Sequence, residues 1–255
     1  MAAALVTGVS RLGGIGAAVA RALARDGWSV AGTGYRSYDA TESWGSEPET
    51  PDRLSSEGVL AAWHEDDLAD ATAAPRILDA AEDAVGALTA LVNVHVRSGQ
   101  GGVLDTSAEE FDRHMAINAR SVLLLSAEFA RRFRGTPGSG RIINFTSSAL
   151  YGELAYGVSK AAVEAITIAA AMDLAPAITV NAVEPGPTDT GWMTPELYER
   201  IRAATPLGRV GLPEDAAELV AFLCSERAGW ITGEIIYSDG GSSLRQTVRR
   251  GRRPL

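Results

Sequence analysis

The sequence is poor in cysteine, in long apolar runs and in basic charge. Its 255 residues include one cysteine, Cys224, which excludes an intrachain disulfide and favours a reducing compartment such as the cytoplasm. No apolar run approaches the roughly 18 residues of a membrane span, and the first residues lack the pattern of a secretory signal. The net charge of −9 argues against nucleic acid as the main partner. We therefore expect a cytoplasmic protein that binds neither membranes nor nucleic acid.

Positive charge is concentrated at the C-terminus. Five arginines follow the last acidic residue, Asp239, and they are Arg245, Arg249, Arg250, Arg252 and Arg253. Such a tail either contacts a phosphate or an acidic partner, or it is a solvated terminus. We divide the chain into one domain over residues 1–244 and a basic tail over residues 245–255.

Short apolar segments alternate with longer segments of helical period, and 46% of the residues are apolar. The predicted strands are Ala3–Thr7, Ser29–Thr33, Val59–Trp63, Ala90–Asn93, Arg141–Phe145, Ile178–Val183 and Ile235–Tyr237. The predicted helices are Ile15–Arg25, Thr72–Val85, Ala108–Phe133, Tyr156–Asp173 and Glu214–Leu223. Continuously apolar strands indicate a parallel sheet buried on both faces. The pattern predicts one α/β domain, a doubly wound Rossmann-type sheet with helices on both faces and ligands at the carboxyl ends of its strands.

Two segments lack a regular period. Residues 34–58 are rich in Ser, Glu, Pro and Thr and predict a long surface loop. Residues 185–206 contain four prolines and predict a loop with a short helix near Leu197–Ala204. A long loop after the carboxyl end of a strand is suited to be a lid.

The first predicted strand leads into a glycine-rich turn, TGVSRLGGIG over residues 7–16, and then into an amphipathic helix. Glycines permit positive φ and let the backbone approach a pyrophosphate, and the free N–H groups of a helix N-terminus attract anions. A glycine cluster alone also fits a tight strand-to-helix turn. Its position in the first β-turn-α unit favours a dinucleotide site.

The choice between NAD and NADP depends on the end of the second strand. NAD sites usually place an acid about 20 residues after the glycine turn, where it binds the ribose hydroxyls. Counting from Gly16, that position holds Arg36. A guanidinium there can clamp a ribose phosphate through two parallel hydrogen bonds, and Arg11 in the glycine turn can approach the same phosphate. We therefore predict NADP(H), although two ordinary surface arginines would give the same sequence.

Tyr156 and Lys160 lie four residues apart at the start of a segment of helical period, so their side chains share a helix face. A free phenol has a pKa of about 10 and exchanges protons poorly at neutral pH. A nearby ammonium lowers that pKa toward the range where acid–base catalysis is effective. The pair predicts a tyrosine made more acidic by a lysine.

Hydroxyl groups follow the predicted strand Arg141–Phe145, in the order Thr146-Ser147-Ser148. The carboxyl ends of strands are where this fold places its ligands. One serine would hold a substrate oxygen while Tyr156 exchanges a proton with it, and the other would cap a turn or a helix.

These motifs occur in one order along nearly the whole chain. They are the turn at residues 7–16, Asp67-Leu68, Asn118 in a long helix, Ser147, Tyr156 with Lys160, Pro185-Gly186-Pro187-Thr188, GR…PED at 208–215 and ITG…DGG at 231–241. In this order the chain resembles the short-chain dehydrogenase/reductase family, in the single-domain branch of the 3-oxoacyl-(acyl-carrier-protein) reductases.

The resemblance implies a role for each matching residue. Tyr156 would be the acid–base, Ser147 would bind the reacting oxygen, and Lys160 would bind the nicotinamide ribose. Asn118 would hold a water that relays protons. Asp67 would bind the adenine amino group, and Thr188 the carboxamide. The implied cofactor contacts are Gly8, Ser10, Arg11, Gly14, Ile15, Gly16, Arg36, Asp67, Leu68, Asn93, Tyr156, Lys160, Pro185, Gly186 and Thr188. No metal site is predicted.

Three features depart from the family pattern. The glycine turn is two residues longer than usual. Residues 92–96 are VNVHV where the family typically has Asn-Asn-Ala-Gly, which puts the cofactor pose in doubt and leaves His95 either near substrate or in a loop. Ser147 lies nine residues before Tyr156, a shorter separation than the family norm, so the pocket should be more open and Ser148 is a rival for the role of Ser147.

We expect an NADP(H)-dependent oxidoreductase that reduces a ketone or 3-oxoacyl carbonyl to an alcohol. Alanines on the Tyr156 helix would allow assembly as a homotetramer or homodimer. One alternative is an NAD-dependent alcohol dehydrogenase of the same family. Another is a nucleotide-binding regulator without turnover, which the altered residues 93–96 permit and the intact Ser, Tyr, Lys and Asn set opposes.

Overall fold

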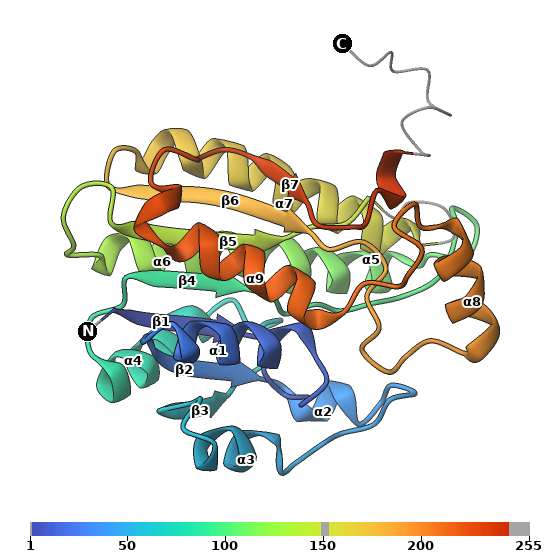
Figure 1. Ribbon diagram of the computed structural model, residues 1–255, viewed down its shortest axis with the longest axis horizontal. Coiled ribbons are helices and arrows are strands. Elements are labelled where there is room, and N and C mark those ends of the chain that lie inside the picture. Colours follow the sequence, from blue (N-terminus) through green and yellow to red (C-terminus); the bar gives the residue numbers. More distant parts are fainter. Residues whose placement is uncertain (1, 149–152, 245–255) are drawn as a thin grey trace.

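The computed structural model describes residues 2–148 and 153–244, in which seven parallel strands form one sheet (Figure 1). The strands are β1 (Ala3–Thr7), β2 (Ser29–Gly34), β3 (Ala62–Glu65), β4 (Ala90–Asn93), β5 (Gly140–Phe145), β6 (Ile178–Glu184) and β7 (Ile235–Tyr237). Their spatial order is β3-β2-β1-β4-β5-β6-β7. This is the predicted doubly wound α/β fold, which is confirmed.

Helices cover both faces of the sheet (Figure 1). They are α1 (Ile15–Arg25), α2 (Arg36–Asp39), α3 (Thr50–Ser56), α4 (Ala73–Val85), α5 (Ala108–His114), the π-helix η1 (Met115–Arg120), α6 (Ser121–Arg132), α7 (Leu154–Leu174), α8 (Pro195–Ala204), α9 (Pro213–Cys224) and the short η2 (Glu226–Ala228). Helices α1 and α9 share one apolar core with the sheet, and α4, α6 and α7 share a second core on the other face. The central strands β1, β4, β5 and β6 are buried along their length, as continuous apolar runs predict.

Three predicted elements differ from the structure. Strand β3 covers Ala62–Glu65 and not Val59–Trp63, because the amides of Val59 and Leu60 bond to Leu54 and close the turn after α3. The predicted single helix Ala108–Phe133 is divided by η1. The segment 34–58 is not a plain loop, since it contains α2 and α3.

Helix α7 is long and apolar enough to cross a membrane by length and composition alone. It packs against β5, β6 and η1, and its inner face carries Lys160 and Thr167. The core helix of a globular domain has the same properties. It begins at Leu154, two residues before Tyr156, so Tyr156 lies inside its first turn.

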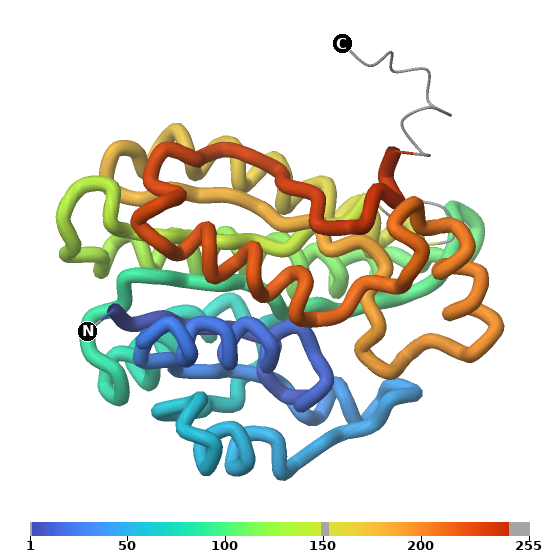
Figure 2. Tube along the Cα trace, viewed as in Figure 1, coloured from blue at the N-terminus to red at the C-terminus, as the bar shows by residue number. Residues whose placement is uncertain are grey.

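The carboxyl ends of the strands share one edge of the molecule, opposite the N-terminus (Figure 1). In Figure 2 the blue segment after β2 and the orange segment after β6 both reach this edge. The catalytic and cofactor residues predicted from the sequence therefore belong to one region. The predicted basic tail lies outside the described residues.

Candidate active site

Tyr156 and Ser147 meet at the end of β5. Ser147 follows that strand by two residues, and Tyr156 lies in the first turn of α7, which packs against the strand. Their side chains are hydrogen-bonded to each other. Ser148 is directed elsewhere, because its hydroxyl donates to Glu184 at 2.6 Å. Of the two serines that the sequence left open, Ser147 is the one beside the phenol.

Lys160 is buried one helical turn beyond Tyr156, with 3% of its surface exposed. Its ammonium nitrogen donates to the carbonyl of Phe145 at 2.9 Å. The same nitrogen lies 5.9 Å from the centre of the Tyr156 ring. The shared helix face therefore brings the two side chains to the end of β5, as the four-residue spacing predicts.

The electrostatics of this pair differ from the expectation. Burial, with the carboxylates of Glu153 and Glu184, raises the pKa of Tyr156 to about 12, and the hydrogen bond from Ser147 opposes that rise. Burial also lowers the pKa of Lys160 to about 7. The net shift is therefore upward and not toward the acidic phenol that the sequence predicts, because desolvation outweighs the hydrogen bond from Ser147. Tyr156 keeps its proton at neutral pH, which is the form that donates.

Asn118 lies in the π-helix η1 and is fully buried. Its side-chain oxygen accepts from the Arg97 amide at 2.7 Å, and its side-chain nitrogen donates to the Arg97 carbonyl and to the Ser159 hydroxyl, both at 2.9 Å. A π-helix within a longer helix often marks a functional site. Protein groups therefore engage both ends of the Asn118 amide and tie it to the Arg97 backbone and to α7.

Glu184 is a site residue that the sequence analysis missed. It ends β6, is 3% exposed, and accepts from the amide of Ser148 at 3.0 Å as well as from its hydroxyl. Among the described residues its second oxygen, Oε2, is buried without a hydrogen-bond partner. Burial raises the pKa of this carboxyl. The sequence did hold a signal for Glu184, because an acidic residue at the end of an apolar strand and directly before Pro185-Gly186 is unusual.

The glycine turn forms the predicted cradle. Gly8 has φ of +73°, and a Cβ on it would lie 2.8 Å from the His95 amide nitrogen. A Cβ on Gly16 would lie 2.3 Å from the Gly8 carbonyl oxygen. Helix α1 begins after Gly14, which has no side chain to cap the first N–H groups of the helix, and its first turn holds no acidic residue. These N–H groups are therefore suited to bind a phosphate. These residues fit a dinucleotide.

The two arginines proposed for NADP both lie beside this cradle but already contact acids. Arg36, after β2, forms an ion pair with Glu65 at 2.6 Å, and its guanidinium lies 4.9 Å from the Trp63 ring. Arg11 lies 3.8 Å from Glu47. A Cβ on Gly34 would lie 2.9 Å from the Cβ of Ser10, so β2 and the turn are in close contact here.

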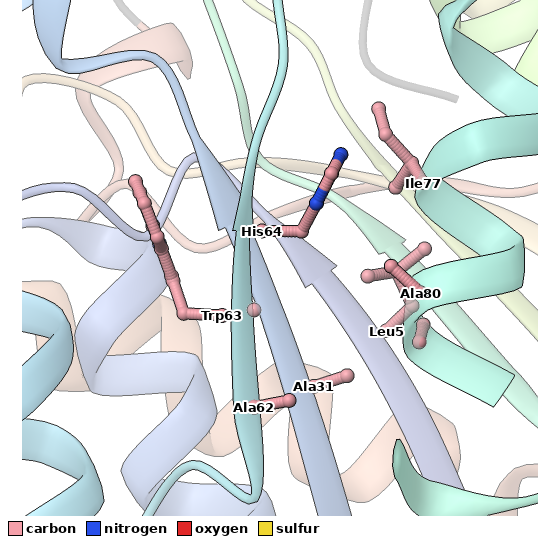
Figure 3. A pocket seen from close by; sticks show the side chains of 9 residues that line it. Leu5, Ala31, Ala62, Trp63, His64, Ile77 and Ala80 are labelled. Carbon is pink, nitrogen blue, oxygen red and sulfur yellow. The ribbon is translucent and has the colours of Figure 1, made fainter. Parts of the chain in front are cut away.

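Figure 3 shows how Trp63 and His64 are oriented on β3. Trp63 and His64 are neighbours on β3 and point to opposite sides of the strand. Trp63 donates to the Val9 carbonyl at 2.8 Å. His64 lies beside α4, where a cavity of about 60 Å³ is lined by Leu5 and Ile77 among others. That cavity is far smaller than the roughly 300 Å³ of small ligand sites.

The remaining predicted cofactor residues are placed at the same edge, with mixed orientations. Asp67 and Leu68 follow β3, and an Asp67 oxygen accepts from the Ala69 amide at 2.8 Å within a turn. The buried Asn93 side chain donates to Asn144 at 2.9 Å, and among the described residues its side-chain oxygen is buried without a hydrogen-bond partner. Pro185, Gly186 and Thr188 follow β6, and Thr188 is buried.

His95 lies in the loop after β4, one of the two positions that the sequence left open, and it is buried there. Its ring lies 2.6 Å from the Thr7 hydroxyl on one side and 2.7 Å from the Ser121 hydroxyl on the other. Burial, with Lys160 nearby, lowers its pKa to about 3, so the ring is neutral. Through His95, the altered VNVHV segment thus links β1 to α6 by hydrogen bonds.

Comparison with known proteins agrees with this geometry. The family model described as enoyl-(acyl carrier protein) reductase matches residues 8–243. The uncharacterized oxidoreductase YjdA of Bacillus subtilis (strain 168) is 43% identical over 93% of this chain and 95% of its own. An NADPH-dependent aldehyde reductase-like chloroplastic protein of Arabidopsis thaliana is 36% identical, with 93% of each chain covered. A blue fluorescent protein from a metagenomic library, solved in complex with NADPH, superimposes with a TM-score of 0.82 at 30% identity, covering 95% of this chain and 98% of its own.

Fold, site and relatives together define a single-domain oxidoreductase that uses a nicotinamide cofactor. The chain belongs to the short-chain dehydrogenase/reductase family.

Proposed function

We propose that this protein is an NADP(H)-dependent reductase that converts a carbonyl compound to an alcohol, with Tyr156 as the acid–base. The observation that carries this function is the hydrogen bond between Ser147 and Tyr156 beside Lys160, at the strand edge that also holds the glycine cradle. In the reductive direction a negatively charged oxygen develops on the substrate. A donor that remains protonated at neutral pH is suited to meet it.

Each side chain has a separate task in this reaction. A bound nicotinamide supplies the hydride. Ser147 holds the substrate oxygen, and Tyr156 donates its proton to that oxygen. Lys160, whose pKa is about 7, can gain or lose a proton at working pH and returns one to the tyrosine. Asn118 acts as a positioning residue that ties the Arg97 backbone to α7 through Ser159.

The preference for NADP rests on Arg36 at the end of β2, where NAD sites usually carry an acid. The names of the Arabidopsis relative and of the metagenomic structure, both of which mention NADPH, agree with it. One observation favours an NAD-linked dehydrogenase instead, because the ion pair with Glu65 already neutralises Arg36. Affinities of the wild type and of Arg36→Ala for NADPH and NADH separate the two. A roughly tenfold loss, about 1.4 kcal/mol, confined to NADPH supports our assignment, and equal losses contradict it.

The substrate class that we propose is a ketone or a 3-oxoacyl compound. The matching family model is described as an enoyl-(acyl carrier protein) reductase, a name that supports an acyl thioester but refers to its C=C bond and not to a ketone. The segment after β6 carries the partly exposed Trp192. Consumption of NADPH with a panel of ketones, aldehydes and 3-oxoacyl thioesters tests this directly. Turnover with none of these compounds would contradict it.

For assembly we propose a homotetramer, or a homodimer as its smaller unit, in the cytoplasm. Leu123 on α6 and Ile168 and Met172 on α7 are exposed apolar side chains, and Trp230 is fully exposed near β7. Apolar groups of this kind mark protein interfaces. The buried thiol of Cys224 agrees with a reducing compartment. Sedimentation that shows only monomer at micromolar concentration would contradict the assembly.

A further inference from the structure

The carboxylate of Glu47 lies on the glycine turn. Its Oε2 accepts from the backbone amide of Leu12 at 2.7 Å and from the hydroxyl of Thr50 at 3.1 Å. Leu12 belongs to the glycine turn, between Gly8 and Gly14. Glu47 itself comes from the segment between α2 and α3, far away in the sequence. An acid of this chain is therefore docked on the loop that is built to receive a phosphate.

Arg11 lies between this carboxylate and the segment after β6. Its Nη2 donates to the Thr190 carbonyl at 2.8 Å, and its guanidinium lies 5.2 Å from the Trp44 ring. Its Nε lies 3.8 Å from Glu47 Oε1, which is too long for a hydrogen bond. Among the described residues this Nε is buried without a hydrogen-bond partner. The turn thus carries a charged donor whose N–H is unused, and a phosphate oxygen would satisfy it.

A cofactor phosphate and the Glu47 carboxylate have the same sign of charge and need the same donors. Two anions that share the same donors would lie within a few ångströms of each other, and their repulsion is stronger where water is partly excluded. We propose that Glu47 is a built-in competitor of the cofactor phosphate, which holds the segment 36–50 on the glycine turn in the free protein and is displaced when a dinucleotide binds. This inference rests on the proposed function only in taking a nicotinamide dinucleotide as the ligand.

A purely structural role for Glu47 predicts the opposite result. If the carboxylate served only to anchor the segment, its removal would loosen the wall of the site and weaken binding. As a competitor, its neutralisation strengthens binding. Glu47→Gln distinguishes the two, because glutamine keeps an acceptor for Leu12 and removes only the charge. Glu49→Gln is the matched control, since Glu49 is exposed on the same segment and its change alters the net charge equally.

The test is the Kd of NADPH and of NADH for wild type and both variants, measured by calorimetry at low salt. We expect Glu47→Gln to bind NADPH roughly tenfold more tightly, and Glu49→Gln to stay within about twofold of wild type because exposed charges are screened. Tightening for NADPH alone assigns the displaced position to the 2′-phosphate. Equal tightening for both dinucleotides assigns it to the pyrophosphate.

Unchanged or weaker binding by a folded Glu47→Gln overturns the inference, and thermal unfolding shows whether the variant is folded. If it is not, Glu47→Asp carries the test, because it keeps the charge but withdraws it from Leu12, and weaker NADPH binding by that variant also overturns the inference. A wild type that prefers NADH contradicts the NADP assignment and leaves the Glu47 comparison intact for the pyrophosphate. A wild type that binds neither dinucleotide overturns both.

Discussion

The catalytic region and the phosphate region share one edge of the sheet but are built in different ways. Tyr156 and Lys160 stand on the long helix α7, and their close partners, the Ser147 hydroxyl and the Phe145 carbonyl, are neutral groups at the end of β5. Arg11 lies in the glycine turn and Arg36 begins the short helix α2, and they face the carboxylates of Glu47 and Glu65. The first region is fixed by packing, and the second by a balance of charges.

This difference indicates how each region responds to change. In the catalytic region desolvation dominates, and it sets the pKa of Tyr156 high and that of Lys160 low. Replacing a side chain there should remove a step of the reaction. In the phosphate region charges are partly solvated, so a substitution should adjust affinity by modest factors. The variants below test this contrast, from the largest expected effect to the smallest.

Tyr156→Phe should have the largest effect. It removes the proton donor and leaves the cofactor cradle unchanged, and general acid–base groups contribute roughly 10²–10⁴-fold to rates. We expect kcat to fall by at least that range while the Kd of NADPH stays within about twofold, because the phenol lies apart from the phosphate cradle. Parallel measurement of turnover and NADPH binding checks both. Undiminished turnover would refute the catalytic role.

Ser147→Ala should follow, with a loss of about 10²-fold in kcat, the usual cost of removing one donor to a developing oxyanion. Ser148→Ala is the matched control, because Ser148 is the next residue and donates to Glu184 instead. We expect its kcat to fall much less. Equal losses in the two variants would show that the structure assigns the wrong serine to the tyrosine.

Glu184→Gln should have a smaller effect that appears in the pH profile. The Glu184 carboxylate raises the pKa of Tyr156, and glutamine keeps an acceptor for Ser148 without the charge. In alcohol oxidation the phenolate is the base, so activity rises as Tyr156 loses its proton. Because the variant lacks the Glu184 charge, the pKa of Tyr156 should fall, and the pH of half-maximal oxidation should move downward with it. Glu109→Gln, at an exposed acid on α5, should leave the profile in place. An upward or absent shift would separate Glu184 from Tyr156.

Sequence-based prediction was most successful for residues that are positioned by regular helices and strands. The four-residue spacing of Tyr156 and Lys160 placed both on one helix face, and the apolar run before Ser147 placed that serine at a strand end. Local periodicity is sufficient for such predictions. The choice between Ser147 and Ser148 required the structure, since it depends on how the chain turns after β5.

Contacts made by irregular segments could not be predicted in the same way. Glu184, Glu47 and Tyr38 act across large sequence separations, and Tyr38 accepts from the Ser98 amide at 3.0 Å. Nothing in the local pattern of residues 34–58 indicates which of its acids reaches the turn. The high pKa of Tyr156 was missed for a related reason. The lysine four residues away is visible in the sequence, but the burial that raises the pKa depends on the whole fold.

The most direct test of the account follows the hydride itself. The protein is supplied with NADPH carrying deuterium at the transferable position of the nicotinamide ring and with a carbonyl compound that it turns over, and the alcohol product is examined by mass spectrometry and NMR. We predict one deuterium on the carbinol carbon of the product. Product without deuterium at that carbon would contradict hydride transfer to a carbonyl.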